Sequence, residues 1–136
     1  MKGLVIIAEN VNQYSPLVLA YIGDAVFEIY VRRMLVSQGN ARVDTLHKKA
    51  TEYVKSSAQS ASYRRIESSL TEEETAVFKR GRNAKSTPPK NADVVEYHTA
   101  TGLEALIGYI YLSGDINRLD EIMDMILKQG DVDNEN

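Results

Sequence analysis

The chain has 136 residues, 43% of them hydrophobic, which is enough for one domain with a buried core. It contains no cysteine and only two histidines, which excludes disulfides and thiolate-held zinc and argues against a histidine-rich metal centre. Any metal would be held by oxygen, which favours Mg²⁺, with Mn²⁺ as an alternative. The net charge of −3 argues against a general binder of nucleic acids, although positive charge is concentrated in one segment.

Residues 1–13 are expected to form an N-terminal extension to a domain that spans residues 14–129, with residues 130–136 as a frayed acidic tail. The apolar run LVIIA near the start is too short for a signal peptide or for the ~18 residues of a membrane span. It could form a strand, but a single strand has no evident partner. The sequence therefore predicts a cytoplasmic protein that does not enter a membrane.

A first helix is predicted from Pro16 to about Leu35, with the preceding serine as its N-cap. Residues 16–31 (PLVLAYIGDAVFEIYV) are apolar nearly all round, which is typical of a buried helix. Two acids, Asp24 and Glu28, nevertheless lie within it. A buried carboxylate costs free energy unless a partner compensates its charge, so these acids are candidates for a functional site.

Helical spacing of apolar residues continues through the middle of the chain. A second helix is predicted from about Val43, and the polar stretch KSSAQSAS that follows either continues it or bends. Thr71 and Glu74 form a capping box at the start of a helix that should end near Gly81. Residues 82–93 should form a loop, because two consecutive prolines cannot lie inside a helix.

Another acid-bearing helix is predicted after this loop and before a last amphipathic helix. Its residues 101–112 (TGLEALIGYIYL) are also apolar nearly all round, but they contain Glu104. Gly108 lies one turn after Glu104, and Gly23 lies directly before Asp24 in the first helix. Because glycine costs roughly 1 kcal/mol against alanine inside a helix, we expect these glycines to mark a close approach of two backbones.

Carboxylates that meet between two crossing helices could hold a divalent metal. Magnesium takes octahedral oxygen coordination and is often held by one or two carboxylates, waters and substrate phosphate. Asp24 and Glu104 fit this pattern, whereas Glu28 could instead reach solvent or pair with Arg32 one turn later. The alternative is structural, with each acid paired to a basic side chain or hydrogen-bonded to a helix cap.

The segment KRGRNAKSTPPK, residues 79–90, has five basic residues and no acid. Such a segment can contact the phosphates of a nucleic acid, which positions the nucleic acid without reading its sequence. The candidate nucleic-acid-binding residues are Lys79, Arg80, Arg82, Asn83, Lys85 and Ser86. A solvated surface loop or a protein-facing role would explain the segment equally well. Further cations that could extend the patch are Lys48, Lys49, Arg64 and Arg65.

Several motifs resemble those of the ribonuclease III family. Residues 21–33 (YIGDAVFEIYVRR) resemble its signature helix, and residues 101–112 resemble its second acidic motif. The chain is also similar to the Mini-ribonuclease III branch in LHKKAT (46–51), FKRGRNAKS (78–86) and PKNADV (89–94). The resemblance covers roughly residues 14–128.

The resemblance implies an all-α fold, a helical bundle like the ribonuclease III endonuclease domain. It also implies a homodimer that cleaves double-stranded RNA with magnesium, each subunit cutting one strand. In the family, the aspartate of the signature helix and the glutamate of the second motif are catalytic and bind the metal. By position these are Asp24 and Glu104. The Mini branch is associated with maturation of large-subunit (23S) ribosomal RNA and with ribosome biogenesis, which implies precursor ribosomal RNA as the substrate.

The sequence departs from the full-length members of the family at two positions. Their site has four acids, and Ala20 and Thr101 stand here at two of those four positions. The number of bound metals is left open, and RNA phosphate, waters or Glu28 would have to contribute ligands. A non-catalytic RNA- or ribosome-binding module is the second reading, and a helical protein-interaction domain is the third. Retention of both Asp24 and Glu104 favours the enzyme.

Overall fold

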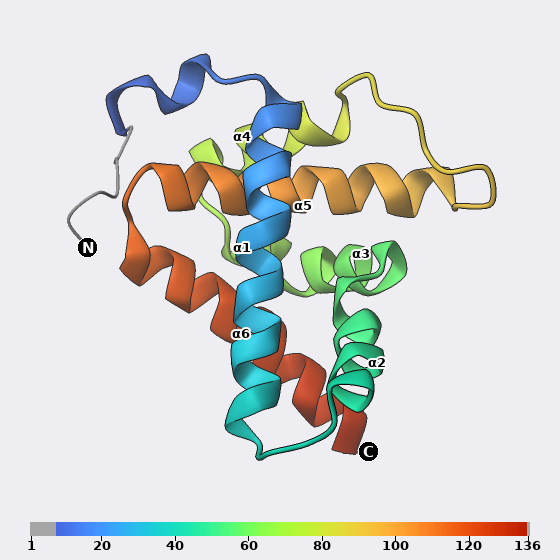
Figure 1. The fold of residues 1–136 in the computed structure, drawn as a ribbon. Helices are drawn as coiled ribbons and strands as arrows, with labels where there is room; N and C mark the ends of the chain where they lie inside the picture. Colours follow the sequence, from blue (N-terminus) through green and yellow to red (C-terminus); the bar gives the residue numbers. More distant parts are fainter. Residues whose placement is uncertain (1–7, 136) are drawn as a thin grey trace.

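The computed structural model describes residues 8–135, which form helices joined by short connections (Figure 1). No strand occurs in this part of the chain, so the predicted all-α fold is confirmed. Most of the apolar run LVIIA falls in residues 1–7, outside the described residues. The elements are η1 (Ala8–Gln13), α1 (Pro16–Ser37), α2 (Val43–Val54), α3 (Ser56–Ile66), η2 (Glu67–Ser69), α4 (Glu72–Arg82), α5 (Val94–Leu112) and α6 (Ile116–Glu135).

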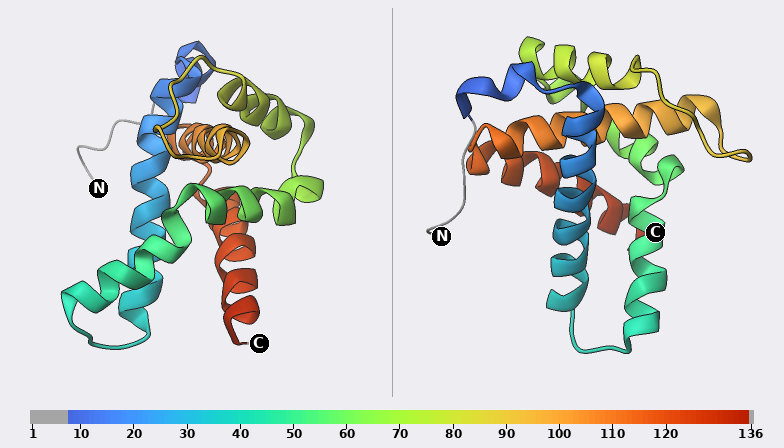
Figure 2. Two further views of the ribbon diagram at one scale, coloured as in Figure 1. Left: turned by 90° about the vertical axis from the view of Figure 1, so that its right-hand side faces the viewer. Right: turned by 45° about the horizontal axis from the view of Figure 1, so that its top comes forward.

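Helix α5 lies at the centre of the fold. It packs against α1, α3, α4 and α6, and a view nearly along its axis shows these helices around it (Figure 2, left). Its side chains Leu103, Leu106 and Ile107 are fully buried. The prediction of a helix buried nearly all round is therefore correct for α5.

Two glycines bring the backbones of α1 and α5 into contact. A Cβ atom at Gly23 would overlap the main-chain oxygen of Glu104, and a Cβ atom at Gly108 would overlap that of Leu19. The nearest atom in each case belongs to the main chain and cannot rotate away, so a larger residue would push the helices apart. The predicted close approach of the two helices is confirmed.

Helix α1 is not buried all round, so that part of the prediction is wrong. Phe27 and Val31 face the core, whereas Tyr21 is 82% exposed and Ile29 is 61% exposed. The neighbouring helices cover only one side of α1, and apolar composition alone does not show which side that is. The exposed apolar residues Val18, Tyr21, Ile29 and Val36 are called the outer face of α1 below.

Local capping signals set the starts of two helices as predicted. The Ser15 side chain accepts a hydrogen bond from the main-chain N–H of Val18 at the start of α1. Thr71 and Glu74 form the predicted capping box of α4. Glu74 also pairs with Arg118 at 2.8 Å, which ties the start of α4 to α6.

Three boundaries add to the sequence prediction or differ from it. The chain bends at Lys55, whose backbone is extended, so the polar stretch forms the separate helix α3. Helix α4 runs through Arg82, so the predicted loop begins at Asn83 instead. Helix α6 continues to Glu135, over residues expected to form a frayed tail. None of the helices within residues 8–135 has the length and apolar character needed to span a bilayer.

Candidate active site

The crossing of α1 and α5 brings the predicted acids together. Asp24 follows Gly23 on α1, and the Gly23 backbone lies directly against the main-chain oxygen of Glu104 on α5. The side chains of Asp24 and Glu104 are close enough to interact by hydrogen bonding and by charge. Asp24 is exposed and Glu104 is partly buried, so the pair has one carboxylate at the surface and one behind it.

Burial and the neighbouring acid both change the acidity of Glu104. Desolvation by burial, and then the hydrogen bond and charge of Asp24, raise the pKa of Glu104 to about 8. A hydrogen bond from Gln59 acts in the opposite direction. Near neutral pH the metal-free pair therefore keeps a proton. A divalent cation would replace that proton and remove the repulsion, so the pair suits a cation held by oxygen.

Gln59 of α3 is a site residue that the sequence prediction missed. Its side chain is 2% exposed, and its Nε2 donates to the Val54 main-chain oxygen at 3.0 Å and to Glu104 Oε2 at 3.5 Å. Its Oε1 is buried without a hydrogen-bond partner in the described structure. The polar stretch around Gln59 carries no pattern that shows which of its residues turns inward.

The remaining acid candidate is already neutralised. Glu28 forms an ion pair with Arg32 at 2.7 Å, as the alternative prediction had it. Ala20 and Thr101 are buried, and the Thr101 hydroxyl donates to the Tyr97 main-chain oxygen at 3.0 Å. Within residues 8–135 no group of three or more His, Asp or Glu side chains is placed to hold a metal. Asp24 and Glu104 are therefore the only carboxylates that this crossing supplies.

The basic residues lie at the end of α4 and in the loop after it. Gly81 packs against residues 101–105 of α5, the same stretch that carries Glu104. Lys79 and Arg80 are exposed in the last turn, and the Arg82 guanidinium lies 5.6 Å from the centre of the Phe78 ring.

The other candidates for RNA contact follow in the loop. Asn83 accepts a hydrogen bond from Arg82 Nε at 3.2 Å, and Ser86 Oγ lies 3.5 Å from His98 Nδ1. Among the described residues, Lys79, Arg80 and Lys85 form no ion pair, so their charges are available to a ligand.

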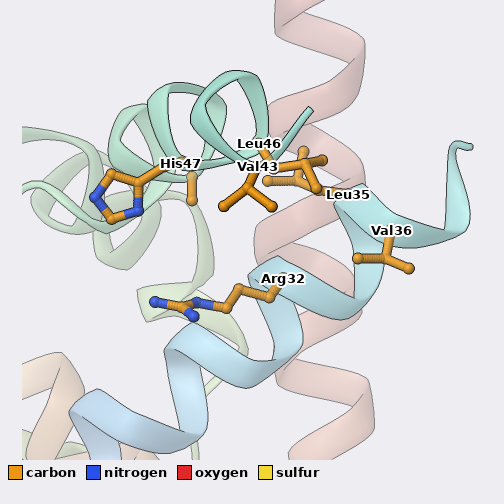
Figure 3. A pocket seen from close by; sticks show the side chains of 7 residues that line it. Arg32, Leu35, Val36, Val43, Leu46 and His47 are labelled. Atoms are coloured by element: carbon orange, nitrogen blue, oxygen red, sulfur yellow. The ribbon is translucent and has the colours of Figure 1, made fainter. Parts of the chain in front are cut away.

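A separate pocket lies between the second half of α1 and α2 (Figure 3). It has a volume of about 210 Å³ and is lined mainly by aliphatic side chains, with Arg32 and His47 supplying nitrogen atoms. Arg32 is engaged by Glu28. The pocket contains neither Asp24 nor Glu104, so it is distinct from the acid pair.

The helical fold around a carboxylate pair at a glycine-lined crossing fits a known nuclease domain. The family model of the ribonuclease III domain matches residues 17–115, from the first turn of α1 to the residues before α6. The chain therefore belongs to the ribonuclease III family.

Within that family the chain is similar to Mini-ribonuclease 3 proteins. It is 50% identical to that of Thermoanaerobacter sp. (strain X514), with 86% of this chain and 83% of the relative covered. It is 46% identical to that of Enterococcus faecalis, with 87% and 92% covered. A crystal structure of a Fusobacterium nucleatum protein superposes with a TM-score of 0.80 at 35% identity, covering 89% of this chain and 98% of that one.

These similarities establish the reaction class. The chain is a double-strand-specific endoribonuclease, a phosphodiester hydrolase. The family acts with a divalent metal, and the oxygen-only pair of Asp24 and Glu104 is chemically suited to one.

The raised pKa of Glu104 predicts how the stability of the metal-free protein depends on pH. The folded protein keeps a Glu104 proton that the unfolded chain releases, so the free energy of unfolding should fall as pH rises from about 4.5 to about 8 and then level off. Denaturant unfolding in chelator across this range measures the effect, and Glu104→Gln should remove most of the fall. Parallel loss of stability in both proteins would contradict the shift.

Proposed function

We propose that Asp24 and Glu104 are the catalytic and metal-binding residues of a magnesium-dependent ribonuclease. The observation that carries the proposal is their meeting at a crossing where glycine holds the two backbones in contact. Two carboxylate oxygen donors leave room for waters and a substrate phosphate in an octahedral shell. Mn²⁺ could replace Mg²⁺, because it accepts the same ligands.

The two acids differ in exposure, and this suggests different parts in the site. Asp24 stands at the surface, where an RNA phosphate can reach it, and Glu104 stands behind it against α3. A bound divalent cation supplies a water of lowered pKa and stabilises charge on the phosphate during hydrolysis. The protein side chains hold and orient this cation. Since Ala20 and Thr101 provide no carboxylate, waters and the substrate phosphate would complete the set of ligands.

The basic segment is proposed to grip the RNA backbone. Its candidate contacts are Lys79, Arg80, Arg82, Asn83, Lys85 and Ser86. Double-stranded RNA is recognised mainly through its shape, its phosphates and its 2′-hydroxyls. Unpaired cations at the end of a helix packed beside the acid pair suit this form of recognition.

The outer face of α1 is proposed to form a homodimer interface. It exposes apolar residues at helical spacing, and next to it Ile22, Ala25 and Ile29 line a groove of about 280 Å³ with α5 and α6. Exposed apolar surface of this kind marks interaction sites. A symmetric pair of sites would let each subunit cut one strand of the duplex.

The biological substrate is proposed to be precursor 23S ribosomal RNA, processed in the cytoplasm during ribosome biogenesis. This part rests on the similarity to Mini-ribonuclease 3 proteins and on the association of that branch with 23S ribosomal RNA, which the sequence resemblance implies.

Replacing either acid should abolish cleavage of a long RNA duplex in Mg²⁺. We expect Asp24→Asn and Glu104→Gln to lose about a thousandfold or more in rate, because a metal supplies several kcal/mol and each 1.36 kcal/mol is tenfold. The matched control is Glu28→Gln, one turn from Asp24 but paired with Arg32, which should stay within a few-fold of wild type. Cleavage that survives Asp24→Asn would place the site elsewhere.

Removing cations of the basic segment should weaken RNA binding and flatten its dependence on salt. For Arg80→Ala, Arg82→Ala and Lys85→Ala combined, the slope of log K against log salt should fall by up to about 3, or about 1 for each lost phosphate contact. The control combines Arg42→Ala, Lys55→Ala and Lys128→Ala, which removes the same charge from cations that are paired with acids. Equal slopes for the two triple variants would sink the proposed role of the segment.

A charge on the outer face of α1 should separate the dimer. We expect wild-type protein to have twice the 15.2 kDa chain mass by light scattering and Ile29→Asp to have the monomer mass. Ile29 is 61% exposed in the single chain, so this change should leave the fold intact. Val95→Asp is the control, because Val95 is 64% exposed at the start of α5. A wild-type monomer, or a dimeric Ile29→Asp, would refute this interface.

A further inference from the structure

We propose that Gln59 is a positioning residue of the active site, which holds the Glu104 carboxylate and presents its amide oxygen to a metal-bound water. The inference rests on the proposed function of Asp24 and Glu104. It concerns a residue of α3 outside the two acid-bearing helices.

The two hydrogen atoms on Gln59 Nε2 have separate uses. One is donated to the main-chain oxygen of Val54 at 3.0 Å. Val54 is the last residue of α2, and carbonyls at the end of a helix lack partners within that helix. This bond fixes the amide at the bend between α2 and α3. The other hydrogen points to Glu104 Oε2 at 3.5 Å, so the amide sits beside the carboxylate in a set orientation.

A purely structural role explains the amide nitrogen but not the amide oxygen. Gln59 is 2% exposed, and its Oε1 has no partner in the described structure. Leaving a buried acceptor unpaired is unfavourable, so a glutamine kept only for packing would be less suitable than an apolar residue of similar size. Beside a carboxylate pair suited to a cation, the natural donor for this oxygen is a water on that cation.

Gln59 and Glu104 would have different roles in the proposed site. The carboxylate of Glu104 would bind the cation, and Gln59 would touch only the carboxylate and a water. Groups of this kind orient ligands rather than supply them, and their loss typically reduces metal affinity or activity 10- to 100-fold. Gln59 would also compensate in part for the missing acids at Ala20 and Thr101, because a neutral amide can order a water without adding charge.

The experiment measures Mn²⁺ binding without RNA, by electron paramagnetic resonance of free Mn²⁺, together with thermal unfolding in chelator. Gln59→Leu should bind Mn²⁺ about tenfold more weakly or worse, while its Tm without metal falls only modestly, because the Val54 oxygen loses its donor but the unpaired amide oxygen is removed as well. The Mg²⁺ concentration for half-maximal cleavage should rise by a similar factor. The matched control is Ser60→Ala, equally buried on α3, which should leave Mn²⁺ affinity unchanged.

A second variant keeps the test valid if Gln59→Leu does not fold. Gln59→Met has a side chain of similar length without the amide and should also bind Mn²⁺ about tenfold more weakly than wild type. Wild-type Mn²⁺ affinity in a folded Gln59→Leu or Gln59→Met would overturn the inference. If Asp24→Asn leaves Mn²⁺ binding unchanged, the proposed metal site itself is wrong, whatever Gln59 does. If Asp24→Asn abolishes binding and Gln59→Leu does not affect it, only the role of Gln59 fails.

Discussion

The backbone contact between α1 and α5 is the constraint on which the site depends. At Gly23 and Gly108 the main chains of the two helices come into direct contact. The positions of Asp24 and Glu104 are thereby set by the packing of two helices, which is more exact than the placement of residues on loops. The same contact explains why Glu104 is partly buried, since α1 lies across the turn that carries it. The contact between α1 and α5 thus produces both the close packing and the costly burial of the Glu104 carboxylate.

Helix α4 also packs closely against α5. A Cβ atom at Gly81 of α4 would lie 2.7 Å from the Cβ of Ala105, and a Cβ atom at Gly102 would lie 2.8 Å from the main-chain oxygen of Phe78. The last turn of α4, with its exposed cations, is therefore fixed relative to the acid-bearing turn of α5. At the other end of α4, the pairing of Glu74 with Arg118 limits movement of the helix. The position of the first basic residues relative to the acids is therefore set by helix packing. Only the basic residues after Arg82 belong to a loop.

The sequence predicted most of the fold because its signals are local. Helical spacing, the capping box at Thr71 and glycine inside apolar helices each act within a few residues, and the structure confirms all three. The sequence could not show which side of α1 is exposed, because apolar composition is the same whether this chain or another one covers it. Gln59 was not predicted either, because its burial depends on the bend at Lys55, which the polar stretch left undecided. The features that the sequence did not reveal are therefore those that depend on tertiary packing.

A site with two carboxylates links the cation to the substrate more strongly than a site with four acids would. Asp24 and Glu104 can offer a divalent cation no more than two negative charges, and waters alone add none. In the proposed site, waters would supply further ligands, and further negative charge would come from the RNA phosphate. Because an RNA that strengthens cation binding must itself be bound more strongly when the cation is present, the two affinities rise together. If Asp24 and Glu104 form the proposed site, a chain with few acids would therefore couple metal binding to the binding of its substrate.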